Sequence, residues 1–383
     1  MGSRKECGVG TGTQTASSLE FDFPDELRLL RETANSFLSD HSPPSLARDV
    51  IENGAPFDAS LWSRIGDMGW LSATVPEEHG GLAAGHLAVC ALAEEIGRAV
   101  APVPFSSSVY LAIEALLRFG SEAQQARYLP GLAAGQLIGT VAVTESTGVN
   151  ASETLRTTVS ARGLHGHKSL VADGSIADIA VVAVTGLTDA PSLYLVECAA
   201  NGVERTPVDT IDPSRGYASM SFDQVPAEPL PGSARGDALD HLLDCAAVMM
   251  AFEQIGIAQG ALDMACDYAR ERFAFGRPIG SFQAIKHKLV DVYVAIELAR
   301  SNAYYGAWAL EQNAPELKRA AAGARVSACE AGWLATKENI QTHGGMGFTW
   351  DLDCHLFYRR SKLLALTLGS ASEWKRKLMR CVS

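Results

Sequence analysis

Apolar and small residues recur at intervals of three and four positions between Ala251 and Phe273. This spacing predicts a helix with one buried face, formed by Ile255, Ile257, Ala258, Ala261, Leu262, Ala265 and Ala269. Two glycines and a proline then interrupt the pattern, at Gly276, Pro278 and Gly280. A second helix is predicted after them, with an apolar side made of Phe282, Ile285, Leu289, Val292 and Ile296. The stretch therefore predicts a helical hairpin.

The same reading divides the chain into three parts. Residues 21–137 have helical periodicity, although the prolines of Ser42–Val50 are expected to break it. Residues 138–235 contain short β-branched runs bounded by Gly, Pro, Asp or Asn, which predict a small antiparallel β-domain. The pattern is helical again over 236–383. Residues 1–20 are rich in Gly, Ser and Thr and are expected to be disordered. The predicted fold class is α+β.

The corner of the helical hairpin carries one cation, two aromatic side chains and an amide: Arg272, Phe273, Phe275 and Gln283. A guanidinium is a natural partner for a phosphate, because its planar fork binds two oxygens at once. Taken alone, the same corner fits an arginine that pairs with a carboxylate inside a helical bundle.

Two motifs in combination resemble a known family. The run RxxFGxPIxxFQ from Arg272 to Gln283, followed by QTHGGMGF from Gln341 to Phe348, is similar to the two FAD-binding signatures of the acyl-CoA dehydrogenases. The segments LWSRIGDMGWLSATVPEEHGG and GSEAQQARYLPGLAAGQLIGTVAVTE fit the same family in order and spacing. The resemblance extends from about Phe21 to about Arg376. It implies an N-terminal helical domain, a central antiparallel β-domain and a C-terminal four-helix bundle.

The resemblance also implies a cofactor site. In the family, the residues of these signatures reach across a dimer interface to the diphosphate and adenosine of the neighbour's FAD. The matching positions here are Arg272, Phe275, Gln283, Gln341, Gly344 and Gly345. Adjacent glycines let the backbone approach the diphosphate more closely than a Cβ would permit. Thr144 matches a segment that touches the flavin ring and the thioester.

The reaction of this family needs a carboxylate that removes the Cα proton of an acyl-CoA thioester, while the flavin accepts hydride from Cβ. Hydrogen-bond donors to the thioester oxygen stabilise the enolate. The resemblance places the carboxylate at position 368 or, in a minority of members, at position 246. These positions hold Leu368 and Ala246, and neither side chain can accept a proton.

Two nearby carboxylates are candidate replacements for the base. Glu253 is seven residues beyond Ala246, on the same helix face and ~10 Å further along the axis. It fits a base in an altered site, and equally a carboxylate that pairs with an arginine or satisfies a buried polar group. Asp244 fits a base or a substrate contact, and equally a solvated residue near a helix end.

The β-domain also departs from the family pattern. Val149 stands where a hydroxyl is usual, Leu170 replaces the aromatic residue that covers the flavin, and Ala172 replaces a second hydroxyl. Each lost hydroxyl removes ~1 kcal/mol of hydrogen bonding. The part of the site that holds the flavin ring is therefore expected to be degraded.

An intact diphosphate side beside a missing base is the pattern of one subunit in a hetero-oligomer. A second acyl-CoA dehydrogenase-like chain would then provide the base and hold the flavin ring. Actinobacterial acyl-CoA dehydrogenases of two different chains are similar, and several act on steroid side-chain CoA esters. One alternative is a self-sufficient homo-oligomeric enzyme with a displaced base. The other is a scaffold or acyl-ligand-binding subunit without FAD.

Composition narrows the classes of protein to which the chain can belong. The 383 residues are 47% hydrophobic and 20% charged, as in soluble globular proteins, and the net charge of −12 argues against nucleic-acid binding. The eight cysteines have no metal-ligand spacing and fit a reducing, cytoplasmic environment. No apolar run is expected to reach the length of a membrane span, and the first residues lack the apolar core of a signal peptide. The resemblance implies a homo- or hetero-tetramer.

Overall fold

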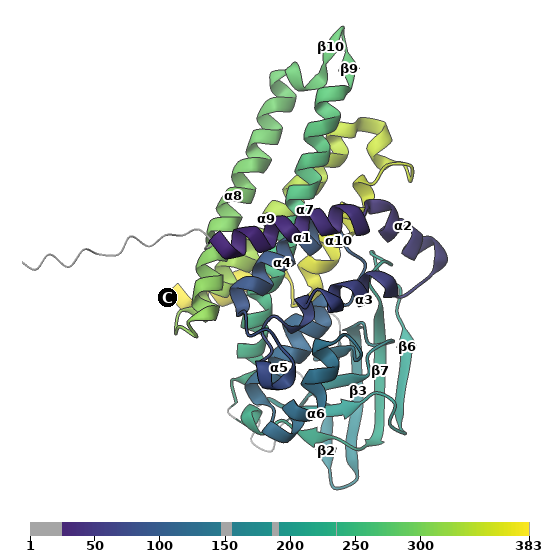
Figure 1. Ribbon diagram of the computed structural model, residues 1–383, viewed down its shortest axis with the longest axis vertical. Helices are drawn as coiled ribbons and strands as arrows, with labels where there is room; N and C mark the ends of the chain where they lie inside the picture. Colours follow the sequence, from purple (N-terminus) through teal and green to yellow (C-terminus); the bar gives the residue numbers. More distant parts are fainter. Residues whose placement is uncertain (1–24, 147–154, 186–190, 235, 383) are drawn as a thin grey trace, which may run out of the picture.

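A computed structural model describes residues 25–146, 155–185, 191–234 and 236–382 of the chain. The predicted disordered segment, residues 1–20, lies outside the described residues. The order of elements is helical, then β, then helical, as the sequence predicted. Figure 1 shows long helices at one end of the molecule and the strands at the other.

The first part of the chain folds into helices that cover the β-domain and the base of the long helices. They are α1 (Asp25–His41), α2 (Pro44–Asn53), α3 (Ala59–Asp67), η1 (Trp70–Ser72), η2 (Glu77–His79), α4 (His86–Arg98), the π-helical η3 (Ser106–Ile113), α5 (Glu114–Phe119) and α6 (Glu122–Ala133). The expected break at Ser42–Val50 does end α1, but Pro44 then begins a new helix, because proline is well tolerated in a first turn.

The middle part forms two four-stranded sheets. Their strands are β1 (Gly139–Ala142), β2 (Thr158–Ser160), β3 (Gly163–Ala172), β4 (Ile179–Thr185), β5 (Pro191–Glu197), β6 (Val203–Pro207), β7 (Tyr217–Val225) and β8 (Glu228–Pro229). One sheet has the order β1-β4-β5-β8 and the other β2-β3-β7-β6. The pairs are antiparallel as predicted, except that β1 and β4 run parallel.

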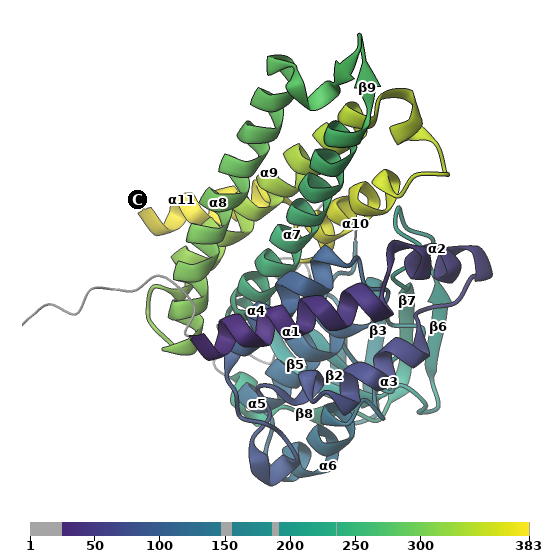
Figure 2. The same cartoon turned by 45° about the horizontal axis from the view of Figure 1, so that its top comes forward.

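The last part contains η4 (Pro231–Ala234), α7 (Ala238–Glu271), the hairpin β9 (Phe273–Ala274) and β10 (Arg277–Pro278), η5 (Ile279–Ser281), α8 (Gln283–Glu311), α9 (Leu317–His343), η6 (Gly344–Phe348), α10 (Cys354–Thr367) and α11 (Ala371–Val382). Helices α7 to α10 pack as a bundle, and α11 lies against α9 (Figure 2).

Helix α7 forms the centre of the protein. By length and composition α7 could cross a membrane, contrary to our interpretation of the sequence, but 94% of its most apolar window is buried inside the protein. It crosses α4 at two glycines. A Cβ at Gly97 would collide with the carbonyl of Glu253, and a Cβ at Gly256 would collide with the carbonyl of Glu94. This close crossing fixes the N-terminal helices against the bundle.

A buried ionic cluster joins α4, α5 and α8. His86 Nε2 lies 3.0 Å from a carboxylate oxygen of Glu114, and the backbone N–H of His86 donates to Glu311 at 2.7 Å. Burial alone would lower the pKa of His86, but hydrogen bonds to Glu114 and Glu311 outweigh burial and raise it to about 9. Burial would raise the pKa of Glu114, yet His86 and Arg118 lower it to about 2. The pair is therefore charged at neutral pH.

This cluster predicts a pH dependence of stability. The pKa of His86 is higher in the folded protein than the ordinary 6.5, so its contribution is complete below pH 6.5 and is lost as the pH rises through 9. We expect the unfolding free energy to fall by roughly 2–3 kcal/mol over this range. His86→Gln should remove most of that loss in urea titrations at pH 6.5 and pH 9. His165→Gln, at an exposed histidine beside Asp223, serves as the control and should show the same fall in unfolding free energy as the wild-type protein. Equal pH slopes for all three proteins would contradict the prediction.

Candidate cofactor site

The helix break predicted by the sequence forms the projecting tip of the molecule (Figure 1). Helix α7 ends at Glu271, and the N–H of Arg272 still donates to the Tyr268 carbonyl at 2.8 Å. Phe275 and Gly276 then take positive φ values of 53° and 78°, the backbone of a two-residue hairpin turn. The turn leaves the Phe275 side chain 96% exposed. The tip therefore presents an aromatic residue to solvent.

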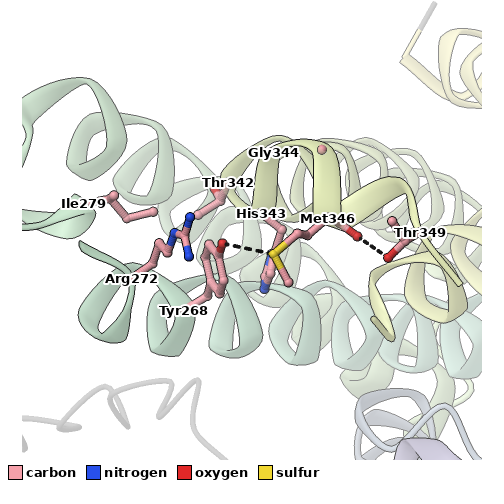
Figure 3. A pocket seen from close by; sticks show the side chains of 9 residues that line it. Tyr268, Arg272, Ile279, Thr342, His343, Gly344, Met346 and Thr349 are labelled. Atoms are coloured by element: carbon pink, nitrogen blue, oxygen red, sulfur yellow. Dashed lines mark hydrogen bonds between the residues drawn. The ribbon is translucent and has the colours of Figure 1, made fainter. Parts of the chain in front are cut away.

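A pocket of about 550 Å³ lies beside this tip, between the end of α7 and the end of α9 (Figure 3). It is lined by Tyr268, Arg272, Ile279, Thr342, His343, Gly344, Gly345, Met346 and Thr349. The pocket thus joins the two sequence signatures, which are separated by about 70 positions along the chain.

The pocket fits an anionic group. Within the described part of the chain, the Arg272 guanidinium has no hydrogen bond or ion pair. Gly344 has a φ of 62°, which favours glycine, and no atom lies within 4 Å of where a Cβ of Gly344 or Gly345 would be. A free cation above an unobstructed glycine backbone can receive a diphosphate. We call Arg272, Gly344 and Gly345 the diphosphate clamp.

An aromatic pair forms part of the wall of the pocket. The rings of Tyr268 and His343 stack at 4.1 Å, and the Tyr268 hydroxyl lies 4.0 Å from the sulfur of Met346. Burial lowers the pKa of His343, so its ring is neutral at pH 7, and Nδ1 donates to the Asn339 carbonyl at 2.9 Å. Nε2 is consequently a hydrogen-bond acceptor. The sequence pattern indicates no role for these residues, although Tyr268 lies one helical turn before Arg272.

The other predicted cofactor residues do not line this pocket. Phe275 is at the exposed tip, and Gln283 and Gln341 are exposed at the start of α8 and near the end of α9. Thr144 lies just after β1 in the β-domain, where its carbonyl accepts from the Ser169 N–H at 2.7 Å. The proposed contacts of these four residues with FAD stay predictions.

Neither inherited base position contains a proton acceptor. Ala246 is fully buried in α7, and Leu368 ends α10. Beside Leu368, the hydroxyls of Tyr217 and Thr367 are 2.9 Å apart, and Tyr217 packs with Ala172 and Leu363. Strand β7 therefore contacts the end of α10 next to the position where the family carries its base.

Glu253 is enclosed by charged partners. Its side chain is fully buried, and one carboxylate oxygen lies 3.4 Å from the Arg215 guanidinium. Arg215 also lies 3.8 Å from Asp173 and donates to the Ser106 hydroxyl. This is the arginine-paired arrangement that the sequence left open as the alternative to a base. A catalytic role for Glu253 stays a prediction, and its surroundings favour a structural one.

Asp244 also has a charged partner. Its carboxylate lies 2.6 Å from the ammonium of Lys377, so it ties α11 to α7. Burial raises the pKa of Asp244 to about 6, against the opposing effect of Lys377. Glu253 is nine residues further along the same helix, or ~14 Å. The two candidate bases therefore lie too far apart to act on the same atom.

A second buried arginine fastens the loop that carries Arg215. The Arg360 guanidinium is fully buried on α10 and donates to Asp212 at 2.5 Å, to the Ser214 hydroxyl at 2.8 Å and to the Ala101 carbonyl at 3.1 Å. The sequence pattern does not decide the role of Arg360 and does not single out Arg215. Both connect the β-domain to the helices from positions far apart in the chain, where helical spacing gives no signal.

The β-domain offers few polar groups to a flavin ring. Glu145 accepts from the buried ammonium of Lys168 at 2.6 Å and from the N–H of Thr157 at 3.0 Å, so its carboxylate is already bonded within the protein. Leu170 has a φ of 53° and is 42% exposed, and Ala172 is buried. Val149 lies outside the described residues. The predicted degradation of the part of the site that holds the flavin ring stays a prediction.

Comparisons with known proteins agree with this geometry. A family model described as acyl-CoA dehydrogenase, N-terminal domain, matches residues 24–136, and one described as acyl-CoA dehydrogenase, C-terminal domain, matches residues 237–380. Acyl-CoA dehydrogenase IpdE2 of Mycobacterium tuberculosis is 35% identical, over 93% of this chain and 96% of that protein. The chain belongs to the acyl-CoA dehydrogenase family.

Two solved structures are similar to nearly the whole chain. One is a variant of the Tcur3481–Tcur3483 steroid ACAD, where ACAD stands for acyl-CoA dehydrogenase. It has a TM-score of 0.86 and 32% sequence identity, and the match covers 93% of this chain and 97% of the chain in that structure. The ChsE4–ChsE5 complex from Mycobacterium tuberculosis has a TM-score of 0.87 and 26% identity, covering 95% and 99%. These similarities confirm the predicted fold with its helical, β and helical parts.

Members of the acyl-CoA dehydrogenase family are FAD-dependent oxidoreductases, so the predicted cofactor and enzyme class are confirmed at the level of the family. FAD supplies the hydride acceptor for α,β-dehydrogenation. In this chain, the diphosphate clamp would hold the phosphates, with Arg272 neutralising charge and the Gly344–Gly345 backbone in close contact. No proton acceptor stands at either position where the family carries its base.

Proposed function

We propose that this chain is the non-base-bearing subunit of a hetero-oligomeric acyl-CoA dehydrogenase, and that it shares FAD with a partner chain of the same family. The observation that carries the proposal is the asymmetry of the site. The diphosphate clamp is open, and the Arg272 guanidinium has no partner within the described part of the chain. In contrast, the two positions for the base hold Ala246 and Leu368, which cannot accept a proton. A chain that performed the whole reaction would need both halves.

The surface of α8 supports assembly with another chain. Four apolar side chains follow one another at helical spacing and are each about half exposed: Val290, Tyr293, Val294 and Leu298. A continuous apolar face of this kind is costly in water and is typical of a surface that another protein covers. It begins two turns into α8, the helix that follows the tip, so a partner bound there could also reach the diphosphate clamp. A tetramer with two copies of each chain would satisfy this arrangement.

The proposed division of labour assigns proton transfer to the partner. The partner's carboxylate would remove the Cα proton of an acyl-CoA thioester and its β-domain would hold the flavin ring. Arg272 of this chain would bind the diphosphate across the interface and orient the cofactor. A steroid-derived acyl group is the substrate class we propose, because the similar Tcur3481–Tcur3483 structure is named a steroid ACAD.

Cofactor stoichiometry tests the proposal directly. The purified chain should show little flavin absorption in the visible range and little or no dehydrogenation of acyl-CoA. Addition of the partner should restore both, with about one FAD for every two chains. About one FAD per chain and full activity of the single chain would overturn the proposal and favour a self-sufficient enzyme. A protein that remains colourless with its partner would favour a scaffold without FAD.

A further inference from the structure

An aromatic residue lies directly behind the glycine loop of the diphosphate clamp. Trp350 follows Thr349, which lines the pocket, and precedes the start of α10. Its indole is 39% exposed, so burial of apolar surface alone does not explain its position. Helix α2 of the N-terminal part lies beside the start of α10 (Figure 2). Trp350 is therefore placed where two distant parts of the chain meet.

Polar and stacking contacts hold Trp350 on several sides. The indole N–H donates to a carboxylate oxygen of Glu52 on α2 at 2.9 Å. The ring stacks on His355 at 4.3 Å with an interplanar angle of 11°. Its backbone carbonyl accepts from the Arg48 guanidinium. The side chain and the main chain of Trp350 are thus both attached to α2.

Arg48 holds the two ends of the segment between the glycine loop and α10. The same guanidinium that donates to the Trp350 carbonyl also donates to the carboxylate of Asp353. Its central carbon lies 5.2 Å from the centre of the indole, within the range of a cation–π contact. We call Arg48, Glu52, Trp350, Asp353 and His355 the Trp350 joint.

The glycine loop is η6 (Gly344–Phe348), which directly follows α9. Gly347 is buried, and a Cβ there would collide with the Ile340 carbonyl, whereas Gly344 and Gly345 are exposed, with no atom within 4 Å of where their Cβ atoms would be. Thr349 closes the loop with a hydrogen bond from its hydroxyl to the Met346 carbonyl at 2.8 Å. Glycines lose more backbone freedom than other residues when they are ordered, and an ordering step during ligand binding weakens that binding.

We propose that the Trp350 joint is a positioning device for the diphosphate clamp. It anchors the C-terminal end of the glycine loop to α2, so that the loop is ordered before a diphosphate arrives. The N-terminal part of the chain thereby contributes to a cofactor site made entirely of residues from the C-terminal part. The proposal rests on the proposed role of the clamp in binding FAD.

The test compares two variants that open the joint, Trp350→Leu and Glu52→Leu, with Glu52→Gln, whose amide oxygen still accepts the indole N–H. Hydrogen exchange of residues 344–349 is measured on the full chain alone. Affinity is measured with ADP on the chain and with FAD on the assembled enzyme. We expect both opening variants to exchange faster at 344–349 and to bind about tenfold more weakly. Glu52→Gln should retain wild-type values.

Arg127→Met is the matched control, because Arg127 on α6 also contacts two carboxylates and an aromatic ring, but its carboxylate partners, Glu197 and Glu228, lie in the β-domain. It should change the melting temperature little, because these ion pairs are exposed, and it should not change exchange at 344–349 or affinity. Opening variants that lower the melting temperature but leave exchange and affinity unchanged would overturn the positioning role. If the wild-type assembly holds no FAD, the proposed function fails, whereas the exchange measurement still decides whether the joint orders the loop.

Discussion

Replacing Glu253 with alanine is expected to lower the free energy of unfolding by about 3–5 kcal/mol, because it leaves the buried charge of Arg215 without its closest carboxylate on α7. Asp173 remains at 3.8 Å but belongs to the β-domain, so it does not tie Arg215 to the bundle. Urea unfolding of the assembled and of the free chain measures the effect. Binding of ADP at the tip should not change in the fraction that is folded.

An exposed ion pair provides the control for this variant. Glu330→Ala removes a carboxylate from Lys375 on the surface, where both side chains are more than half exposed, and should cost less than about 1 kcal/mol. Glu253→Gln keeps the shape of the side chain and should retain dehydrogenation in the assembled enzyme. Loss of activity in Glu253→Gln at unchanged stability would contradict the structural role and identify Glu253 as a base.

Replacing Arg272 with glutamine is expected to weaken the binding of FAD to the assembled enzyme by roughly 10- to 100-fold, the range for loss of a hydrogen bond to a charged group. The Arg272 side chain has no intramolecular partner in the described part of the chain, so its removal should leave the melting temperature nearly unchanged. Titration of the flavin-free assembly with FAD, followed by flavin fluorescence, gives the affinity.

Arg270→Gln is the matched control for Arg272→Gln. Arg270 is two residues away and exposed, but its guanidinium pairs with Asp267 at 2.7 Å and does not line the pocket. It should retain the affinity of the wild-type chain. Equal losses in the two variants would indicate a general effect of positive charge at the tip and would contradict a specific contact with the diphosphate.

Local patterns of the sequence predicted local structure well. The spacing of apolar residues identified α7 and α8, and the Ser-x-x-Gln pattern at Ser121 is a capping box with reciprocal hydrogen bonds to Gln124. The same approach missed that Pro44 begins a helix, because a proline both ends one helix and is accepted in the first turn of the next. The parallel pairing of β1 with β4 depends on a long connection, about which the strand pattern carries no information.

The candidate site was predictable only where it is built from neighbours in the chain. Arg272 and the glycines Gly344 and Gly345 lie in short motifs, and the structure brings these motifs together in one pocket. The fate of Glu253 was not predictable, because its partner Arg215 is 38 positions away on a loop before β7. An isolated carboxylate in an apolar helix has the same sequence pattern whether it is a base or one half of an ion pair.

The close crossing of α4 and α7 has a consequence for biosynthesis. Gly97 can reach its neighbours on α7 only after about 160 further residues have been translated, a delay of roughly ten to thirty seconds at ordinary elongation rates. During that time the apolar surface of α4 that α7 covers in the folded protein is exposed, although α1 has already been made and can pack against α4. The nascent chain is therefore expected to need protection from aggregation. Ribosome-bound fragments that stop before α7 should therefore recruit chaperones, whereas fragments that include it should be released from them.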